Sequence, residues 1–88
     1  MKRDIYSVFG NQVRTKFILC LSQKPKNVTD LIRTCGLSQS AVSQHLSKLK
    51  QSGLVDAKKE GKEVWYSLTH KKAAHVSKLL LSLEQEVL

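Results

Sequence analysis

The stretch from residue 37 to residue 53, LSQSAVSQHLSKLKQSG, constrains the fold most, because it reads as one amphipathic helix with a defined start and end. Ser38 is a good N-cap, since its hydroxyl can accept from unpaired N–H groups of the first turn. Gly53 suits the left-handed position just past a helix. Apolar residues recur between them at helical spacing and predict a buried stripe: Ala41, Val42, Leu46 or His45, and Leu49.

The opposite face of this helix is polar and contains no acidic residue. A helix face that is merely solvated usually mixes Glu with Lys, and these form stabilising pairs one turn apart. Gln can pair with an adenine edge, Ser can donate to bases or phosphates, and Lys neutralises a phosphate. The face therefore favours nucleic-acid recognition over an ordinary surface helix that lacks acids. Its residues are Gln39, Ser40, Ser43, Gln44, Ser47 and Lys48.

The charge balance points to a polyanionic partner. Among 88 residues, 15 Lys and Arg stand against 7 Asp and Glu, which gives a formal net charge of +8. Such an excess favours double-stranded DNA or RNA first and an anionic membrane second. No apolar run approaches the roughly 20 residues that span a bilayer, and the N-terminus lacks the apolar core of a signal peptide. A length of 88 residues predicts a single domain over residues 1–88. Two cysteines form no disulfide framework, so we expect the protein in the cytoplasm.

Three shorter helices are predicted before the polar one, over about residues 2–9, 12–22 and 28–35. Arg14 and Lys16 are expected to keep one side of the second helix in water, and Thr29 is expected to cap the third. Residues 24–27 contain Pro25 and predict a loop. The third helix is joined to the polar helix by only a few residues around Gly36, which is the helix-turn-helix arrangement. In that arrangement the second helix enters the major groove.

After Gly53 the pattern alternates and predicts a β-hairpin. Strands are expected at residues 54–58 and 64–68, with a charged tip at 59–63. A hairpin directly after a helix-turn-helix is a wing, and its Lys58, Lys59 and Lys62 can reach phosphates or a minor groove. The alternative is an ordinary solvated hairpin, which Glu60 and Glu63 favour.

A last helix is predicted over residues 70–88, capped by Thr69. It carries an apolar seam with spacings of four, three and four, which is more apolar surface than a small domain needs for its own core. We expect a homodimer formed by the first and last helices; a helix that packs only on its own domain is the alternative. The expected interface residues are Ile5, Phe9, Val76, Leu79, Leu80, Leu83 and Val87. The fold class is then mainly α with a β-hairpin wing (α+β), in the order four helices, two strands and one helix.

The stretch VTDLIRTCGLSQSAVSQHLSKLKQSGLVDAKKEGKEVWYSLT resembles the winged-helix repressors of the ArsR/SmtB family, and the resemblance extends over about residues 6–83. It implies a homodimer that binds a pseudo-palindromic operator near a promoter, with repression relieved by an inducer. It also implies that the polar-helix residues Gln39, Ser40, Ser43 and Gln44 contact bases and phosphates, and that the tip at residues 59–62 is the wing.

The sensor positions depart from the family pattern. The start of the third helix, where many members bind metals through cysteines, holds Val28, Thr29 and Asp30. His70 and His75 lie about 140° apart around a helix, so they do not chelate together, and zinc needs three or four protein ligands. We predict no metal site and no cofactor, and the small-molecule inducer is not indicated.

Cys20 and Cys35 are the remaining sensor candidates. Cys20 resembles in position a cysteine that some members use to sense persulfides or oxidants, but the last helix has no cysteine. A cysteine flanked by Leu19 and Leu21 is more typically a small buried apolar residue. A thiol-redox-responsive repressor and a winged-helix protein-interaction module are the alternatives to a DNA-binding regulator. An enzyme is not expected, because no nucleophile–base set and no phosphate-binding glycine loop is present.

Overall fold

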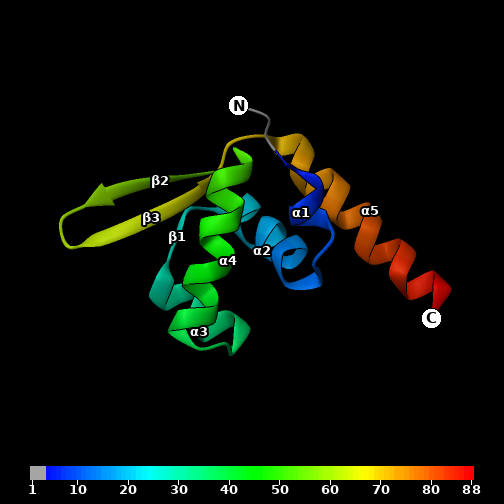
Figure 1. Ribbon diagram of the computed structural model, residues 1–88, viewed down its shortest axis with the longest axis horizontal. Coiled ribbons are helices and arrows are strands. Elements are labelled where there is room, and N and C mark those ends of the chain that lie inside the picture. The colour runs from blue at the N-terminus through cyan, green and yellow to red at the C-terminus, as the bar shows by residue number, and fades with distance from the viewer. Residues whose placement is uncertain (1–3) are drawn as a thin grey trace.

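The computed structural model describes residues 4–88, which form five helices and three short strands along the chain. The elements follow one another as α1 (Tyr6–Phe9), α2 (Gln12–Gln23), β1 (Lys26–Asn27), α3 (Val28–Cys35), α4 (Gln39–Ser52), β2 (Val55–Glu60), β3 (Glu63–Leu68) and α5 (Lys71–Val87). The β2–β3 hairpin extends from one end of the molecule and the C-terminal half of α5 from the other (Figure 1). The predicted winged helix-turn-helix architecture and its order are confirmed, with β1 as an addition.

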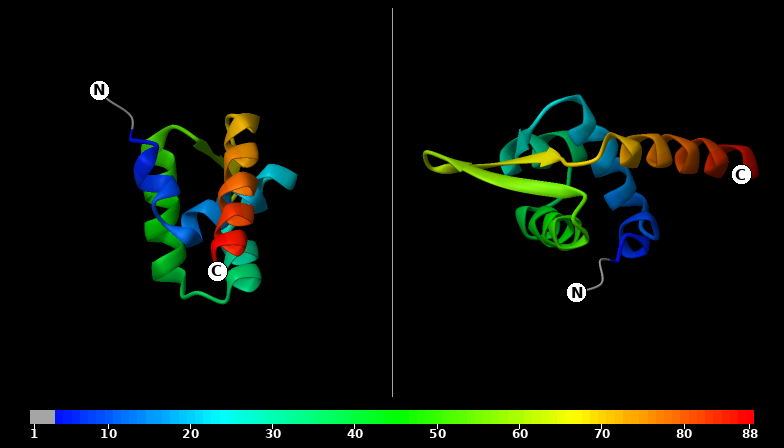
Figure 2. Two further views of the ribbon diagram at one scale, coloured as in Figure 1. Left: turned by 90° about the vertical axis from the view of Figure 1, so that its right-hand side faces the viewer. Right: turned by 90° about the horizontal axis from the view of Figure 1, so that it is seen from above.

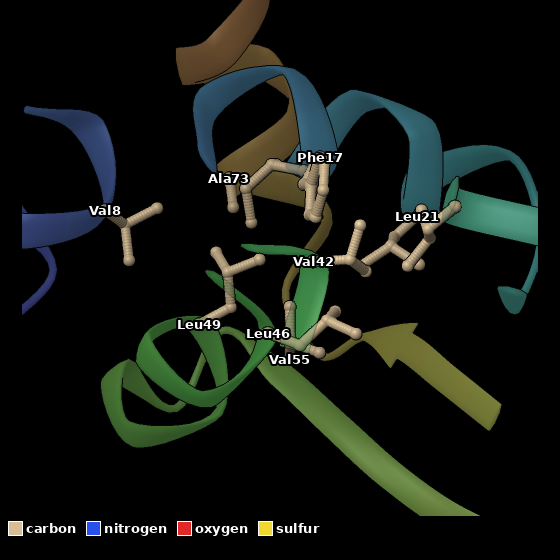
Figure 3. Packing of buried hydrophobic residues seen from close by; sticks show 10 residues of the cluster. Val8, Phe17, Leu21, Val42, Leu46, Leu49, Val55 and Ala73 are labelled. Carbon is tan, nitrogen blue, oxygen red and sulfur yellow. The ribbon is translucent and has the colours of Figure 1, made fainter. Parts of the chain in front are cut away.

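One hydrophobic core holds these elements together. Figure 3 shows its side chains converging from α1, α2, α4, β2 and α5. Ala73 and Ser77 are small and buried, so α5 can lie close against α2. The buried stripe predicted for α4 is confirmed at Val42, Leu46 and Leu49, while Ala41 and His45 are half-buried. The buried apolar residues are Val8, Phe17, Ile18, Leu21, Leu31, Val42, Leu46, Leu49, Val55 and Ala73.

Both predicted ends of α4 are confirmed. The Ala41 N–H donates to Ser38 Oγ at 3.1 Å, which satisfies one of the open donors of the first turn. Gly53 follows the last turn with φ 83°, a left-handed conformation that costs glycine little. These two residues fix where the helix begins and ends, and so fix which side chains its polar face presents.

The predicted cap of α3 is wrong. Asn27, not Thr29, is the N-cap: its Oδ1 accepts from Asp30 N–H at 2.8 Å, and Asp30 Oδ2 accepts from Asn27 N–H at 3.4 Å. The position of this cap depends on a strand pairing that is distant in the sequence. Lys26 and Asn27, predicted to be loop, form β1 against Tyr66 and Trp65 of β3, so the extended chain turns into helix at Val28.

The predicted cap of α5 is also wrong. Thr69 remains tied to the end of α4, because its hydroxyl donates to the Gly53 carbonyl at 2.7 Å and its N–H donates to Leu54 O at 2.9 Å. His70 is the N-cap instead and makes no side-chain capping bond. The first helix is shorter than predicted, since it begins at Tyr6 after Ile5; residues 1–3 of that prediction lie outside the described residues.

The wing is a longer hairpin than its sequence predicts. The sheet has the antiparallel order β1-β3-β2, with Val55 opposite Leu68 and Glu60 opposite Glu63. Only Gly61 and Lys62 form the turn, and Gly61 has φ 63°. Glycine with positive φ at the first central position is typical of a type II′ turn. Within residues 4–88, no helix is long and apolar enough to cross a membrane.

Candidate nucleic-acid interface

The polar face of α4 is fully presented to solvent. Gly36, with φ 68°, ends α3 and turns the chain within three residues into α4. Because the apolar stripe of α4 is fixed in the core, the opposite side of the helix must face outward. All six residues predicted to bind DNA on this helix are exposed: Gln39, Ser40, Ser43, Gln44, Ser47 and Lys48. The structure thus brings them together on one outer surface.

The wing adds positive charge beside this surface. β2 follows α4 directly, and the hairpin projects away from the helical body in both Figure 1 and the right-hand view of Figure 2. Lys59 and Lys62 are exposed. Lys58 pairs with Glu60 at 3.6 Å, but side-chain exposures of 79% and 60% make this a weak ion pair.

Arg14 is not the solvated residue that the sequence predicts. Its Nε and Nη2 donate to the Ser7 carbonyl at 3.1 and 2.9 Å, and its Nη1 donates to His45 Nδ1 at 3.3 Å. Sequence reasoning missed this site, because its three residues come from α1, α2 and α4, and Arg14 and His45 are 31 positions apart. One feature of the sequence does point to this contact. His45 stands at the edge of the apolar stripe of α4, where a titratable ring needs a polar partner from another element.

His45 lies in a setting that favours its neutral form. Its ring meets Phe17 edge to face, with centroids 5.8 Å apart. Burial, and secondly the positive charge of Arg14, lower the pKa of His45 below its ordinary value of 6.5. A neutral ring whose Nδ1 accepts from Arg14 carries its proton on Nε2.

The C-terminal half of α5, which carries most of the residues predicted to form a dimer interface, lies at the far end of the molecule from the wing (Figure 1). On α5, Leu79, Leu83 and Val87 are 58%, 55% and 78% exposed. A groove of about 430 Å³ separates the C-terminal half of α5 from the α1–α2 connection. Ile5 and Leu80 are also exposed, while Phe9 and Val76 are half-buried, and Phe9 packs on the core.

The two cysteines are free thiols, half-buried and packed against the core. Burial raises the pKa of Cys35, nearby Cys20 raises it further, and Lys16 partly opposes them. A raised pKa leaves less thiolate, which is the reactive form. Among residues 4–88, no group of three or more His, Cys, Asp or Glu side chains is placed to hold a metal ion.

The helix-turn-helix, the wing and the basic charge define the class of protein: a winged helix-turn-helix DNA-binding protein. Residues 11–57 match the model of a family described as bacterial regulatory protein, arsR family, so the chain belongs to that family. Proteins of this family are transcriptional regulators and not enzymes. The chain is accordingly a DNA-binding transcriptional regulator.

Named relatives agree with this assignment. The transcriptional activator HlyU of Vibrio cholerae is 33% identical over 76 residues, which are 86% of this chain and 70% of HlyU. The biofilm growth-associated repressor of Xylella fastidiosa is 28% identical over 80 residues, which are 91% of this chain and 70% of that repressor.

Solved structures agree as well. HlyU from Vibrio cholerae superposes with a TM-score of 0.78 over 90% of this chain and 86% of that one, at 33% identity. The repressor BigR from Xylella fastidiosa gives a TM-score of 0.80 over 90% and 81% of the two chains, at 28% identity. The fold and the order of its elements are therefore those of the family.

Proposed function

We propose that the chain is a cytoplasmic repressor that binds a pseudo-palindromic operator as a homodimer, with residues 1–88 acting as one domain. In this proposal α4 enters the major groove and the wing, residues 58–63, contacts the backbone or an adjacent minor groove. Two copies related by a two-fold axis then place their α4 helices in successive major grooves, about 34 Å apart. The first and last helices form the interface between the copies.

The observation that carries this proposal is the exposed, acid-free face of α4. Amide side chains such as Gln44 offer a donor and an acceptor that match the major-groove edge of adenine. Ser40 and Ser43 suit either bases or phosphates, and Lys48, Lys59 and Lys62 suit phosphates. The Gln and Ser side chains would then set sequence preference, and the lysines would set affinity and salt dependence.

Fluorescence anisotropy with DNA from the protein's own upstream region and with random DNA, at two salt concentrations, tests this proposal. We expect a preference for the upstream DNA that persists at the higher salt. Gln44→Ala should lose about 1–3 kcal/mol on the specific site and much less on random DNA. Lys62→Ala should weaken both equally and lower the salt slope by about 1, whereas Lys78→Ala on the exposed side of α5 should change neither.

Two results would count against the proposal. Identical losses for Gln44→Ala on specific and random DNA would remove its base-reading role. Absence of DNA binding at either salt would favour a winged-helix protein-interaction module, since an apolar protein contact depends little on salt.

The direction of regulation needs a separate experiment, because the named relatives include an activator and a repressor. In vitro transcription from the upstream promoter should decrease as the protein is added, if the operator overlaps the promoter. An increase in transcript would make the protein an activator while leaving its DNA-binding mode intact.

A further inference from the structure

A pocket of about 360 Å³ lies between the N-terminal part of α2 and the middle of α4; we call it the α2–α4 pocket. Three of its lining residues, Gln44, Ser47 and Lys48, belong to the exposed polar face of α4. The other two are Arg14 and His45. The pocket is therefore continuous with the proposed DNA-binding surface and extends it onto α2.

The charge in and around this pocket favours an anion. Arg14 and Lys48 are its charged lining residues, and neither α2 nor α4 contains an Asp or Glu anywhere along its length. Two acidic residues, Asp4 and Glu84, form hydrogen bonds with α1 and α2. Asp4 accepts from the Ser7 N–H at 3.2 Å, and Glu84 of α5 accepts from Gln12 at 2.7 Å. Neither lines the pocket.

Arg14 is held in place before any ligand arrives. Three of its five N–H groups donate to Ser7 O and His45 Nδ1, which leaves one N–H on Nη1 and one on Nη2. A guanidinium fixed by protein contacts loses little further side-chain entropy on binding. Paired N–H groups of arginine match the spacing of phosphate oxygens better than an ammonium group does.

We propose that the α2–α4 pocket binds one phosphate-type oxyanion through Arg14 and Lys48, with Ser47 as a further donor and with Gln44 left to read a base. A backbone phosphate flanking the groove that α4 occupies is one source of this group, and a free inorganic oxyanion is the other. Assignment to DNA rests on the proposed operator-binding mode. Arg14 then extends the DNA contacts beyond the helix-turn-helix and wing.

The DNA arm of the test measures dissociation constants over a series of salt concentrations for Arg14→Gln and for Lys16→Gln. Lys16 is an exposed residue of the same helix outside the pocket, so the two variants match in charge change. For Arg14→Gln we expect weaker binding to specific and random DNA alike and a salt slope lower by about 1. Lys16→Gln should leave the slope close to that of the unmodified protein. Weaker binding with an unchanged slope would show that Arg14 only positions α1, and would overturn the DNA assignment.

A second pair of variants guards against structural effects of Arg14→Gln. Lys48 lines the pocket, and Lys50, two residues further along α4, is exposed outside it. Lys48→Gln should lower the salt slope as Arg14→Gln does, and Lys50→Gln should not. Equal salt slopes for Lys48→Gln and Lys50→Gln would show that DNA phosphate does not bind in the pocket.

The anion arm uses no DNA. The thermal midpoint of the full chain is measured with inorganic phosphate and with chloride at equal ionic strength. A saturable rise with phosphate that Arg14→Gln and Lys48→Gln both lose supports an oxyanion site, and if the DNA slope is unchanged it assigns that site to a free oxyanion. If Arg14→Gln leaves the salt slope unchanged and phosphate does not raise the thermal midpoint, the proposal is overturned. If the protein binds no DNA at all, the proposed function fails, and the phosphate measurement alone decides the pocket.

Discussion

At the scale of single residues, His45 connects α4 to α2, through contacts with Arg14 and Phe17. Its ring touches Phe17 of the core on one side and the Arg14 guanidinium on the other. A protonated ring would face that guanidinium as a like charge and lose its role as acceptor. The lowered pKa of His45 expresses this preference for the neutral form.

This preference predicts that acid weakens the fold. Because the pKa of His45 is lower in the folded chain than in the unfolded chain, the unfolded chain binds more protons as the pH falls below about 6.5. The free energy of unfolding should therefore decrease as the pH falls through that range. His45→Gln keeps an acceptor for Arg14 but does not titrate, so its stability should fall less steeply. Urea unfolding at several pH values measures both slopes, and equal slopes would contradict the role given to His45.

Cys35 carries a second prediction at this scale. Since burial and Cys20 raise the pKa of Cys35, its thiol should react with iodoacetamide near neutral pH more slowly than a free thiol does. The rate, followed by mass spectrometry of the Cys35 peptide in the unmodified protein, should continue to rise with pH beyond the ordinary thiol range. Rapid reaction at neutral pH, together with oxidant-induced DNA release that a double Cys→Ser variant abolishes, would favour the redox-responsive alternative.

At the scale of elements, the sequence predicts what depends on neighbours along the chain. Ser38 and Gly53 bound α4 through contacts within three residues, so the helix and its polar face follow from the sequence. The N-cap of α3 does not, because Asn27 is made extended by a strand almost forty residues later. Thr69 fails as a cap for a similar reason, since its hydroxyl donates to Gly53.

The candidate site likewise contains residues that the sequence predicts and one that it does not. The exposed residues of α4 could be predicted from helical spacing, because one apolar stripe determines the opposite face. Arg14 could not, since its partners Ser7 and His45 lie on two other helices. A basic residue on an amphipathic helix is ordinarily solvated, and only tertiary packing shows that this one is held.

The corrected cap of α3 predicts a contrast between two neighbouring residues. Asn27→Ala removes the acceptor for Asp30 N–H and should lower the free energy of unfolding by about 1 kcal/mol. Thr29→Ala, inside the first turn and exposed, should change it by less than about 0.5 kcal/mol. Denaturant unfolding of the two variants gives the comparison. A larger loss for Thr29→Ala would restore the cap that the sequence suggests.

At the scale of the whole molecule, the wing and the C-terminal half of α5 lie at opposite ends of a body whose longest dimension is 43 Å, with α4 between them (Figure 1). The wing occupies one end, and the exposed apolar face of α5 occupies the other. Large apolar side chains gathered on one exposed helix are expected where a partner covers them. A second copy meeting the first at α5 leaves both wings and both α4 faces free for DNA.

Leu83→Glu tests this arrangement, because it places a carboxylate in the centre of the exposed apolar face. Burying that charge in an interface costs several kcal/mol, so the variant should be monomeric by light scattering at concentrations where the unmodified protein is dimeric. Its affinity for a two-half-site operator should fall at least about tenfold, which corresponds to about 1.4 kcal/mol, while its affinity for a single half-site should stay nearly constant. Gln85→Glu is the matched control, since it adds the same charge to an exposed position about 200° around α5 from Leu83. If Leu83→Glu and Gln85→Glu have the same mass and the same operator affinity, the α5 face is not the dimer interface.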